Sequence, residues 1–226
     1  MSLYGTENEI TTPAKILVAD DHSLLREALC KKLDDKPHLE VIAQADNGHQ
    51  VVKLSQKYIP DVILMDISMP DLNGVEAARR INENNSDIKI IALSMHSEQK
   101  FVIDMLKAGS LGYLHKSCHF EELIEAIKLV LSGEIYLDRS IGTKVIKNFL
   151  NAMSKENDEG TVSLTNRERE VLQMVTEGKS SKEIAFKLGI EEHTIVKHRQ
   201  NIMNKLDIRD IPGLTKYAIR EGIIFL

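Results

Sequence analysis

Short apolar runs alternate with longer amphipathic stretches over about the first 130 residues of the chain. Each run holds four to six residues, many of them branched, which is typical of strands buried on both faces of a parallel sheet. The stretches between the runs carry apolar side chains at helical spacing. We therefore predict strands at 15–20, 39–43, 62–66, 88–93 and 111–114, and helices at about 22–33, 48–57, 74–82, 97–108 and 120–131.

This alternation of strand and helix predicts an α/β domain with helices on both faces of a parallel sheet. We expect a flavodoxin-like, doubly wound sheet of five strands in the order 2-1-3-4-5, with right-handed crossovers. In such a sheet the carboxyl ends of the first and third strands flank the crevice where ligands bind.

The second half of the chain has only helical patterns. Residues 138–153 carry an apolar helical stripe, whereas 154–163 have the polar, breaker-rich composition of a flexible linker. Residues 164–226 predict four helices, because two capping-box patterns mark helix starts and two glycines mark helix ends. The capping boxes are Thr165–Glu168 and Ser180–Glu183, and the glycines are Gly178 and Gly189.

Two of these helices have the spacing of a helix-turn-helix motif, at about 180–188 and 192–206. The second one carries Lys197 and Arg199, and its apolar positions fall on the opposite side. A basic outer face and an apolar inner face suit a helix that lies in the major groove of DNA. The same pattern also fits a solvated charged face on a small bundle, and the spacing alone leaves both open.

The predicted elements divide the chain into a flexible tail at 1–14, an α/β domain at 15–132, a linker with one helix at 133–163 and an all-α four-helix domain at 164–226. The net charge differs between the two parts of the chain. Residues 161–226 hold 11 Lys and Arg against 9 Asp and Glu, whereas the remainder has a net charge of −7. An acidic front and a mildly basic end indicate different partners for the two domains.

The composition excludes several classes of protein. No apolar run approaches the roughly 20 residues that cross a bilayer, and residues 1–14 lack a signal-peptide core. We expect a cytoplasmic protein without membrane contact, in which Cys30 and Cys118 are reduced. His115 and His119 have ligand-like spacing but straddle a predicted strand-to-helix turn, so we expect no metal site there.

Chemically useful side chains recur where the predicted strands end. The first strand ends on Asp20 and Asp21, the third on Asp66, the fourth on Ser94 and the fifth near Lys116. Three carboxylates in one crevice need a cation, and Mg²⁺ suits oxygen ligands shared with phosphate. A hydroxyl and an ammonium group would serve the remaining phosphoryl oxygens. The nucleophile would be Asp66, because carboxylates form acyl phosphates.

Each of these residues also has an ordinary interpretation. Asp20 and Asp21 are acceptable acids at a helix start, Ser94 is an acceptable turn hydroxyl, and Lys116 could simply be solvated. Their coincidence at successive strand ends favours the shared site.

Four segments of the first domain closely resemble the receiver domain of two-component response regulators. They are Ala19–His22, Leu64–Pro70 followed by Gly74, Ala92–His96 and Gly112–Lys116. The resemblance implies that a histidine kinase phosphorylates Asp66. It implies that Mg²⁺ binds Asp21, Asp66 and the Ser68 backbone carbonyl, with Asp20 acting through water. It also implies that Lys116 and Ser94 contact the phosphoryl group, and that Tyr113 moves inward when Ser94 is drawn to it.

The second domain resembles the LuxR-type helix-turn-helix domain. The matching segments are Leu164–Leu172, Lys182–Ala185 and Thr194–Leu206. A receiver followed by this domain is similar to the NarL/FixJ class of transcriptional regulators. The resemblance implies a recognition helix from about 193 to 206 and a dimerisation helix at about 210–221. The DNA contacts it implies are Thr194, Val196, Lys197, His198, Gln200 and Lys205, with Val196, Lys197 and Gln200 facing bases.

The second domain departs from the class at three positions. Val196 stands where many relatives have lysine, Glu191 replaces a serine cap and Ser181 replaces a common asparagine. The base sequence read by relatives therefore cannot be transferred to this chain. Val196 could instead meet a thymine methyl group.

We expect a DNA-binding transcriptional regulator rather than an enzyme, in which phosphorylation controls homodimerisation and promoter binding. The enzyme alternative, an aspartyl-phosphate hydrolase of the haloacid-dehalogenase type, would need an acid where this chain has Ser68. A protein-binding scaffold would show no Mg²⁺-dependent phosphorylation. RNA binding is a further alternative, but the second domain lacks the aromatic side chains on which RNA bases stack.

Overall fold

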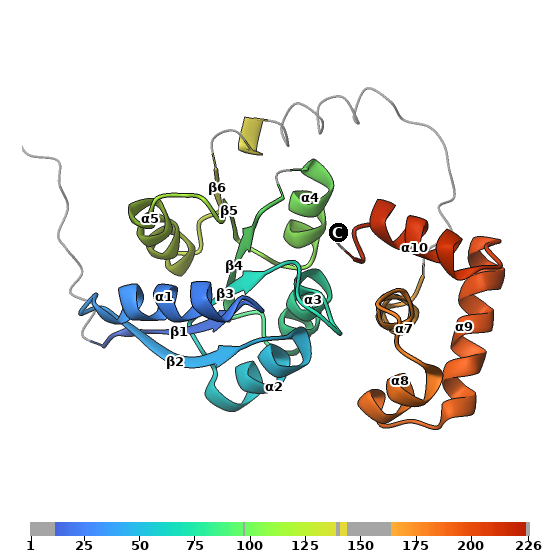
Figure 1. The fold of residues 1–226 in the computed structure, drawn as a ribbon. Helices are drawn as coiled ribbons and strands as arrows, with labels where there is room; N and C mark the ends of the chain where they lie inside the picture. Colours follow the sequence, from blue (N-terminus) through green and yellow to red (C-terminus); the bar gives the residue numbers. More distant parts are fainter. Residues whose placement is uncertain (1–11, 97, 139–140, 144–163, 225–226) are drawn as a thin grey trace, which may run out of the picture.

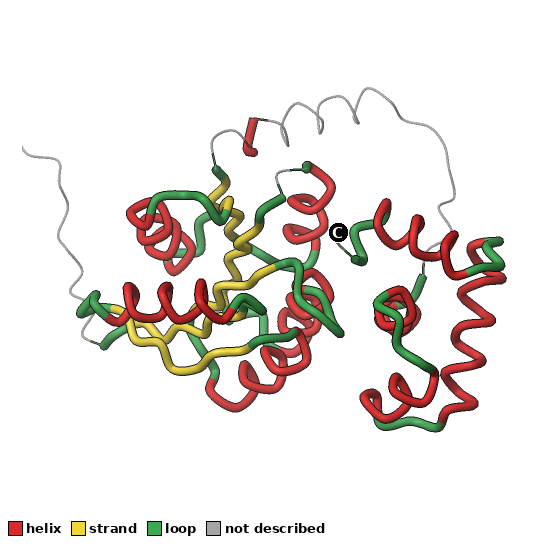
Figure 2. Tube along the Cα trace, viewed as in Figure 1, coloured by secondary structure: helices red, strands yellow, loops and turns green. Residues whose placement is uncertain are grey.

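The structure is a computed structural model that describes residues 12–96, 98–138, 141–143 and 164–224. Among these residues, a parallel sheet flanked by helices is followed by a purely helical part (Figures 1 and 2). The strands pair in the order β2-β1-β3-β4-β5-β6, and all pairs are parallel. The strands are β1 (Ala14–Ala19), β2 (Leu39–Ala45), β3 (Val62–Asp66), β4 (Lys89–Ser94), β5 (Gly112–His115) and β6 (Tyr136–Leu137).

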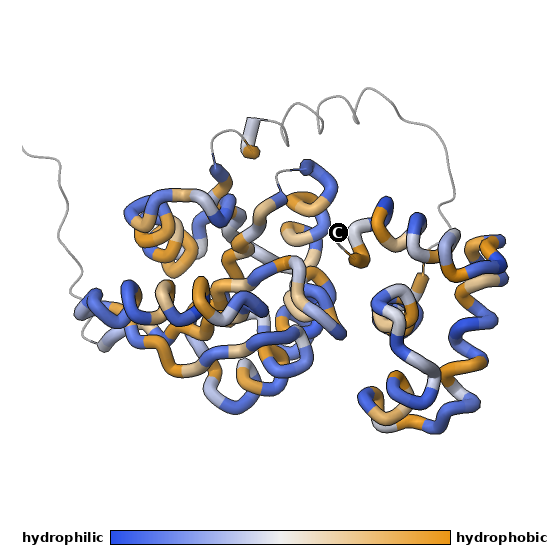
Figure 3. Tube along the Cα trace, in the orientation of Figure 1, coloured by the Kyte–Doolittle hydropathy of each residue, from blue (hydrophilic) through white to orange (hydrophobic). Residues whose placement is uncertain are grey.

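Helices cover both faces of this sheet because the central strands are apolar on both sides. All five residues of β3 are buried, and Figure 3 shows hydrophobic residues along the central strands. One apolar cluster joins the sheet to α2, α3 and α4, and a second joins it to α1 and α5. These helices are α1 (Ser23–Asp34), α2 (Gly48–Tyr58), α3 (Gly74–Asn84), α4 (Gln99–Lys107) and α5 (Phe120–Leu131).

The predicted order 2-1-3-4-5 is confirmed for the first five strands. The predicted number of strands is one too low, because Tyr136 and Leu137 form a short sixth strand beside β5. The Tyr136 N–H donates to the Leu111 carbonyl at 2.8 Å, and the Asp138 N–H donates to the Tyr113 carbonyl at 3.3 Å. A two-residue strand has no periodicity that sequence analysis could detect, and its existence depends on the neighbouring strand.

Parts of the predicted tail, linker and linker helix lie outside the described residues. These parts are residues 1–11, 139–140 and 144–163. Within the helix predicted at 138–153, residues 141–143 are helical.

The second domain contains the four predicted helices. They are α7 (Asn166–Thr176), α8 (Ser181–Leu188), α9 (Glu192–Leu206) and α10 (Ile211–Arg220). Both predicted capping boxes are present, Thr165 with Glu168 before α7 and Ser180 with Glu183 before α8. The turn between α8 and α9 begins at Gly189, whose φ of 63° is in the left-handed region that favours glycine.

The helical domain docks against the loop that follows β3. The Gln173 side chain of α7 accepts a hydrogen bond from the Asn73 N–H at 3.0 Å and donates to the Met69 carbonyl at 3.1 Å. Lys179 forms an ion pair with Asp71 at 2.6 Å. Both Gln173 and Asn73 are buried, so the second domain satisfies polar groups of the first.

Two further ion pairs flank this contact. Arg80 of α3 meets Glu170 of α7 at 2.9 Å, and Lys100 of α4 meets Glu221 after α10 at 2.7 Å. Helix α9 lies on the side of its domain that faces away from the sheet (Figure 1). The docked arrangement therefore leaves α9 uncovered by the first domain.

Candidate phosphorylation site and DNA interface

The predicted acids meet at the carboxyl ends of two neighbouring strands. Asp66 is the last residue of β3, and Asp20 directly follows β1, which pairs with β3. Both are buried, whereas Asp21 beside them is exposed. Ligand atoms of Asp20, Asp21, His22 and Asp66 all lie within 4.8 Å of one another. The structure thus brings together the three carboxylates that sequence analysis selected.

Lys116 is placed among these acids by β5. Its ammonium group lies 2.8 Å from a carboxylate oxygen of Asp20 and 2.8 Å from one of Asp66. Burial opposes a charged lysine, but the two carboxylates outweigh burial and raise the pKa of Lys116. Burial raises the pKa of Asp66, and the nearby Lys116 offsets part of that effect. A lysine held between two acids keeps a positive charge at the point where a phosphoryl group would arrive.

Ser94 and Tyr113, which we call the switch pair, lie on adjacent strands β4 and β5 and are both fully buried. The Ser94 hydroxyl accepts a hydrogen bond from the His96 N–H at 3.0 Å. The Tyr113 hydroxyl donates to the His96 carbonyl at 2.8 Å, so the structure places the aromatic ring in the inward position. Burial raises the pKa of Tyr113 to about 12, which keeps this hydroxyl a donor.

The loop after β3 holds the Ser68 backbone beside the site. The Ser68 N–H donates to a carboxylate oxygen of Asp66 at 3.2 Å. The loop closes at Gly74, whose N–H donates to the Ile67 carbonyl at 2.9 Å. A Cβ atom on Gly74 would overlap the Asp66 carbonyl oxygen, which explains why glycine is needed at this close approach.

Two contacts of the acidic site were not predicted. The guanidinium of Arg26 on α1 donates to the Asp20 carbonyl, and the His22 ring lies 2.8 Å from a carboxylate oxygen of Asp21. His22 begins the predicted helix and Arg26 lies one turn further along it, and helical spacing gives no sign of a contact with the strand end. Arg26 holds the backbone of Asp20, and the His22 ring lies against the exposed Asp21.

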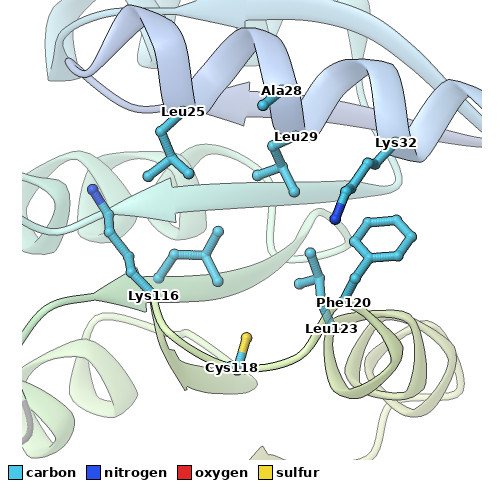
Figure 4. A pocket seen from close by; sticks show the side chains of 9 residues that line it. Leu25, Ala28, Leu29, Lys32, Lys116, Cys118, Phe120 and Leu123 are labelled. Carbon is cyan, nitrogen blue, oxygen red and sulfur yellow. The ribbon is translucent and has the colours of Figure 1, made fainter.

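An apolar groove adjoins the phosphorylation site between α1 and the start of α5 (Figure 4). The cavity has a volume of about 220 Å³, and Lys116 lies at one end of it. Leu29 of α1 faces Leu123 of α5 across the groove, and Leu25 of α1 lies near Lys116. Leu24, the neighbour of Leu25, is 81% exposed.

Four of the six predicted DNA contacts are exposed on α9. Ile195 and Ile202 are buried in the core of the domain, whereas Val196, Lys197 and Gln200 are exposed. Val196 is 55% exposed, so its side chain is available to a partner. The helix starts at Glu191 without a side-chain cap, in agreement with the departure from the serine found in relatives.

The other predicted contacts differ in their availability. Thr194 and His198 are partly buried. Lys205 is exposed, but its ammonium group binds Glu168 of the α7 capping box at 2.7 Å. The structure therefore gives Lys205 a place in the contact between α9 and α7, which the sequence pattern did not indicate.

No helix among the described residues is both long and apolar enough to cross a bilayer.

Comparisons with known proteins agree with this architecture. The sequence model of the response regulator receiver domain matches residues 16–128, and that of bacterial regulatory proteins of the luxR family matches residues 162–218. The chain is 36% identical over 235 residues to the transcriptional regulatory protein DegU of Brevibacillus brevis, with 98% of each chain covered. It is 37% identical over 210 residues to the transcriptional regulatory protein LiaR of Bacillus subtilis (strain 168), covering 93% of this chain and 99% of the relative.

A solved structure also resembles this chain. It is a two-component response regulator of the LuxR family from Aurantimonas sp. SI85-9A1, with 28% identity and a TM-score of 0.59 over 62% of this chain and 99% of that one. Both domains, their order and nearly the whole length are thus shared with regulators of known type. The chain belongs to the two-component response regulators, DNA-binding transcription regulators in which a receiver domain precedes a LuxR-type domain.

Proposed function

We propose that Asp66 accepts a phosphoryl group from a partner histidine kinase, and that this modification controls homodimerisation and promoter binding. The observation that carries the proposal is the position of Lys116, 2.8 Å from both Asp20 and Asp66 at the end of β3. A buried carboxylate beside a fixed cation is suited to forming an acyl phosphate. The chain is then a regulator whose own chemistry is limited to gaining and losing this group, not an enzyme with a small-molecule substrate.

The transfer exchanges one bond to phosphorus for another. A carboxylate oxygen of Asp66 forms the new P–O bond, the P–N bond of the kinase phosphohistidine breaks, and its electron pair returns to the imidazole. Lys116 neutralises the added charge on the phosphoryl oxygens, and the Ser94 hydroxyl donates to one of them. The Ser94 hydroxyl accepts a hydrogen bond from the His96 N–H, so reorientation of this hydroxyl changes a contact with the His96 backbone.

Mg²⁺ is the cofactor that the site suits. The four clustered side chains, Asp20, Asp21, His22 and Asp66, offer three carboxylates as hard oxygen donors within a small volume. Asp21, Asp66 and the Ser68 backbone carbonyl would hold the ion, with Asp20 acting through water. When bound, Mg²⁺ offsets the charge of the carboxylates and of the phosphoryl oxygens.

The kinase would contact the exposed end of α1. Leu24 is exposed three residues after Asp21, and its neighbour Leu25 lines the apolar groove of Figure 4. Exposed apolar residues next to a reactive site are typical of a protein-docking surface. Replacing Leu24 with Ala should slow transfer from the kinase at least severalfold and leave transfer from a small phosphoryl donor unchanged.

For the output domain we propose that α9 lies in the major groove of promoter DNA, with Val196, Lys197 and Gln200 facing bases. A homodimer paired through α10 would read two half-sites about one helical turn apart. Thr194 and His198, in the first half of α9, would contact the phosphate backbone of the DNA. We place the protein in the cytoplasm, where it can contact both the phosphorylated kinase and the DNA.

The test is an intact-mass spectrum after incubation with Mg²⁺ and a small phosphoryl donor. The wild-type chain should gain one phosphoryl group, and Asp66→Asn should gain none. Asp61→Asn is the matched control, because Asp61 lies just before the opposite end of β3 and caps the Lys15 N–H. Phosphorylation of the folded Asp66→Asn variant would contradict the assignment. A wild-type chain that stays unmodified yet binds beryllofluoride would show that the phosphoryl group must come from the kinase.

A further inference from the structure

Phe101 lies between the switch pair and the DNA-binding domain. It belongs to the first turn of α4 and is partly buried. Its ring centroid is 5.2 Å from that of His96, and the two ring planes are inclined by 56°. Tilted aromatic pairs at this separation attract each other beyond the effect of buried area alone. The position of His96 therefore influences the position of Phe101.

His96 is bound through its backbone to both members of the switch pair. Its N–H donates to the Ser94 hydroxyl and its carbonyl accepts from the Tyr113 hydroxyl. When Ser94 turns toward a phosphoryl group on Asp66, the His96 backbone must follow or lose this hydrogen bond. If the backbone follows, the His96 ring that packs against Phe101 shifts with it.

On its other side Phe101 meets the DNA-binding domain at Gly222. A Cβ atom on Gly222 would overlap Cε1 of the Phe101 ring and lie 3.0 Å from Cδ1, so the ring fits against bare backbone. Gly222 has a φ of 67° in the turn that follows α10, and the next residue, Ile223, is buried in the core of its domain. The Ile223 carbonyl accepts a hydrogen bond from the Asn73 side chain at 3.2 Å. The ring thus touches a rigid point of the second domain.

We propose that Phe101 is the positioning residue through which the switch pair changes the docking of the DNA-binding domain. Phosphorylation moves the His96 segment, Phe101 moves with it, and its fit against Gly222 is lost. The docked arrangement then loses free energy relative to the undocked one, which is the differential interaction that a conformational switch requires. The inference rests on the proposed phosphorylation of Asp66 and adds the route from that site to the second domain.

Lys100 offers a matched control at the neighbouring position. Its ammonium group binds the Glu221 carboxylate at 2.7 Å and the Arg220 carbonyl at 2.9 Å, so it also joins α4 to the end of α10. In the described contacts it does not touch His96 or the switch pair. As long as the docked arrangement predominates in both states, a residue that only strengthens docking should change DNA affinity by the same factor with and without the phosphoryl analogue, whereas a coupling residue should change the ratio of the two affinities.

The experiment uses the full-length chain and DNA selected by that chain from a random pool. Affinity is measured with and without Mg²⁺ and beryllofluoride, and phosphoryl uptake is measured separately by mass. The ratio of the affinity with beryllofluoride to the affinity without it should be at least fivefold smaller in Phe101→Ala than in the wild type. Phe101→Tyr should retain the wild-type ratio. Lys100→Ala should keep the wild-type ratio, and phosphoryl uptake should be normal in all three variants.

A second approach begins from Gly222. Gly222→Ala should lower the ratio in the wild-type background, and its effect should shrink when Phe101 is also alanine, because the two residues share one contact. A wild-type ratio in Phe101→Ala, or an equal loss of ratio in Lys100→Ala, would overturn the proposal. Phosphoryl uptake without any gain of DNA affinity in the wild type would also overturn it. Absence of uptake, even from a kinase, would instead contradict the proposed function.

Discussion

The acidic site of the receiver and the outward face of α9 are built in opposite ways. The acidic site gathers residues from three strand ends, and its charges, Asp20, Asp66 and Lys116, are buried and paired with one another. The α9 face comes from a single helix, and Val196, Lys197 and Gln200 are exposed. The first region has its geometry fixed by contacts within its domain, whereas the side chains of the second face solvent and are available to a partner.

This difference teaches what kind of change each region can tolerate. In the acidic site an added atom meets backbone, and a lost charge leaves a buried partner unpaired. On the α9 face a substitution removes one contact among several, and the fold barely changes. We therefore expect abrupt losses of function in the first region and graded losses in the second.

The largest expected effect is that of Gly74→Ala. The added methyl group would overlap the Asp66 carbonyl oxygen and lie 2.9 Å from the Ile67 Cα, so the site must shift. We expect a loss of about 3 kcal/mol in unfolding free energy and slower phosphorylation, measured by thermal denaturation and by mass. Gly178→Ala is the control, because no atom lies within 4 Å of its Cβ position and only its φ of 86° costs about 1 kcal/mol. Equal losses in the two variants would contradict the abrupt behaviour of the acidic site.

Lys197→Ala should show the graded behaviour of the α9 face. Because Lys197 is proposed to face bases, its removal should weaken binding about fivefold on the preferred DNA and less on other sequences, and the slope of log affinity against log salt should fall by at most about one. The melting temperature should not change, because the side chain is exposed. Binding titrations at several salt concentrations measure both quantities. An equal loss on the preferred DNA and on random DNA would contradict the assignment of Lys197 to the bases.

Val196→Ala should produce a smaller and sequence-dependent loss. If the exposed side chain meets a thymine methyl group, we expect about a threefold loss on the preferred DNA and none when that thymine is replaced by deoxyuridine, which lacks the methyl group. Competition binding with the two DNAs measures the difference. A loss of the same size on both would mean that Val196 does not read the methyl group.

Lys205→Ala should have the smallest effect, and the effect should be on stability. Lys205 binds Glu168 at 2.7 Å, but it is substantially exposed, so we expect about 0.5 kcal/mol and an unchanged salt slope. Burial raises the pKa of Glu168, but its hydrogen bonds from Lys205 and Thr165 dominate and hold that pKa below 4.5. The stabilisation is therefore present above pH 4.5 and is lost as pH falls through the lowered pKa. A reduced salt slope in Lys205→Ala would instead show that Lys205 contacts DNA.

Local patterns were sufficient for most of the fold. The runs that became β1 and β3 were apolar on both faces, and the capping boxes at Thr165 and Ser180 marked helix starts correctly. Strand order followed from a general property of alternating strands and helices, which also placed Asp20 and Asp66 together. Such features depend on neighbours in sequence or on rules shared by all parallel sheets.

Long-range contacts were beyond these patterns. Strand β6 exists only because β5 offers backbone partners. Lys205 forms an ion pair with Glu168, although its position on α9 had predicted a contact with DNA. The docking of Gln173 on Met69 and Asn73 also gave no local signal. Each contact joins groups from separate elements, and its formation depends on how those elements pack.

The sequence by itself determined the two domains and placed the acids at the strand ends, because these follow from residue type and short-range periodicity. The recognition helix was assigned by the resemblance to LuxR-type domains, because its spacing alone also fitted a solvated helix face. The tertiary structure alone decided which face of the second domain docks, that α9 stays uncovered, and that Phe101 fits between His96 and Gly222. The physical reason is that these outcomes depend on shape complementarity and on pairing of buried polar groups across distant segments.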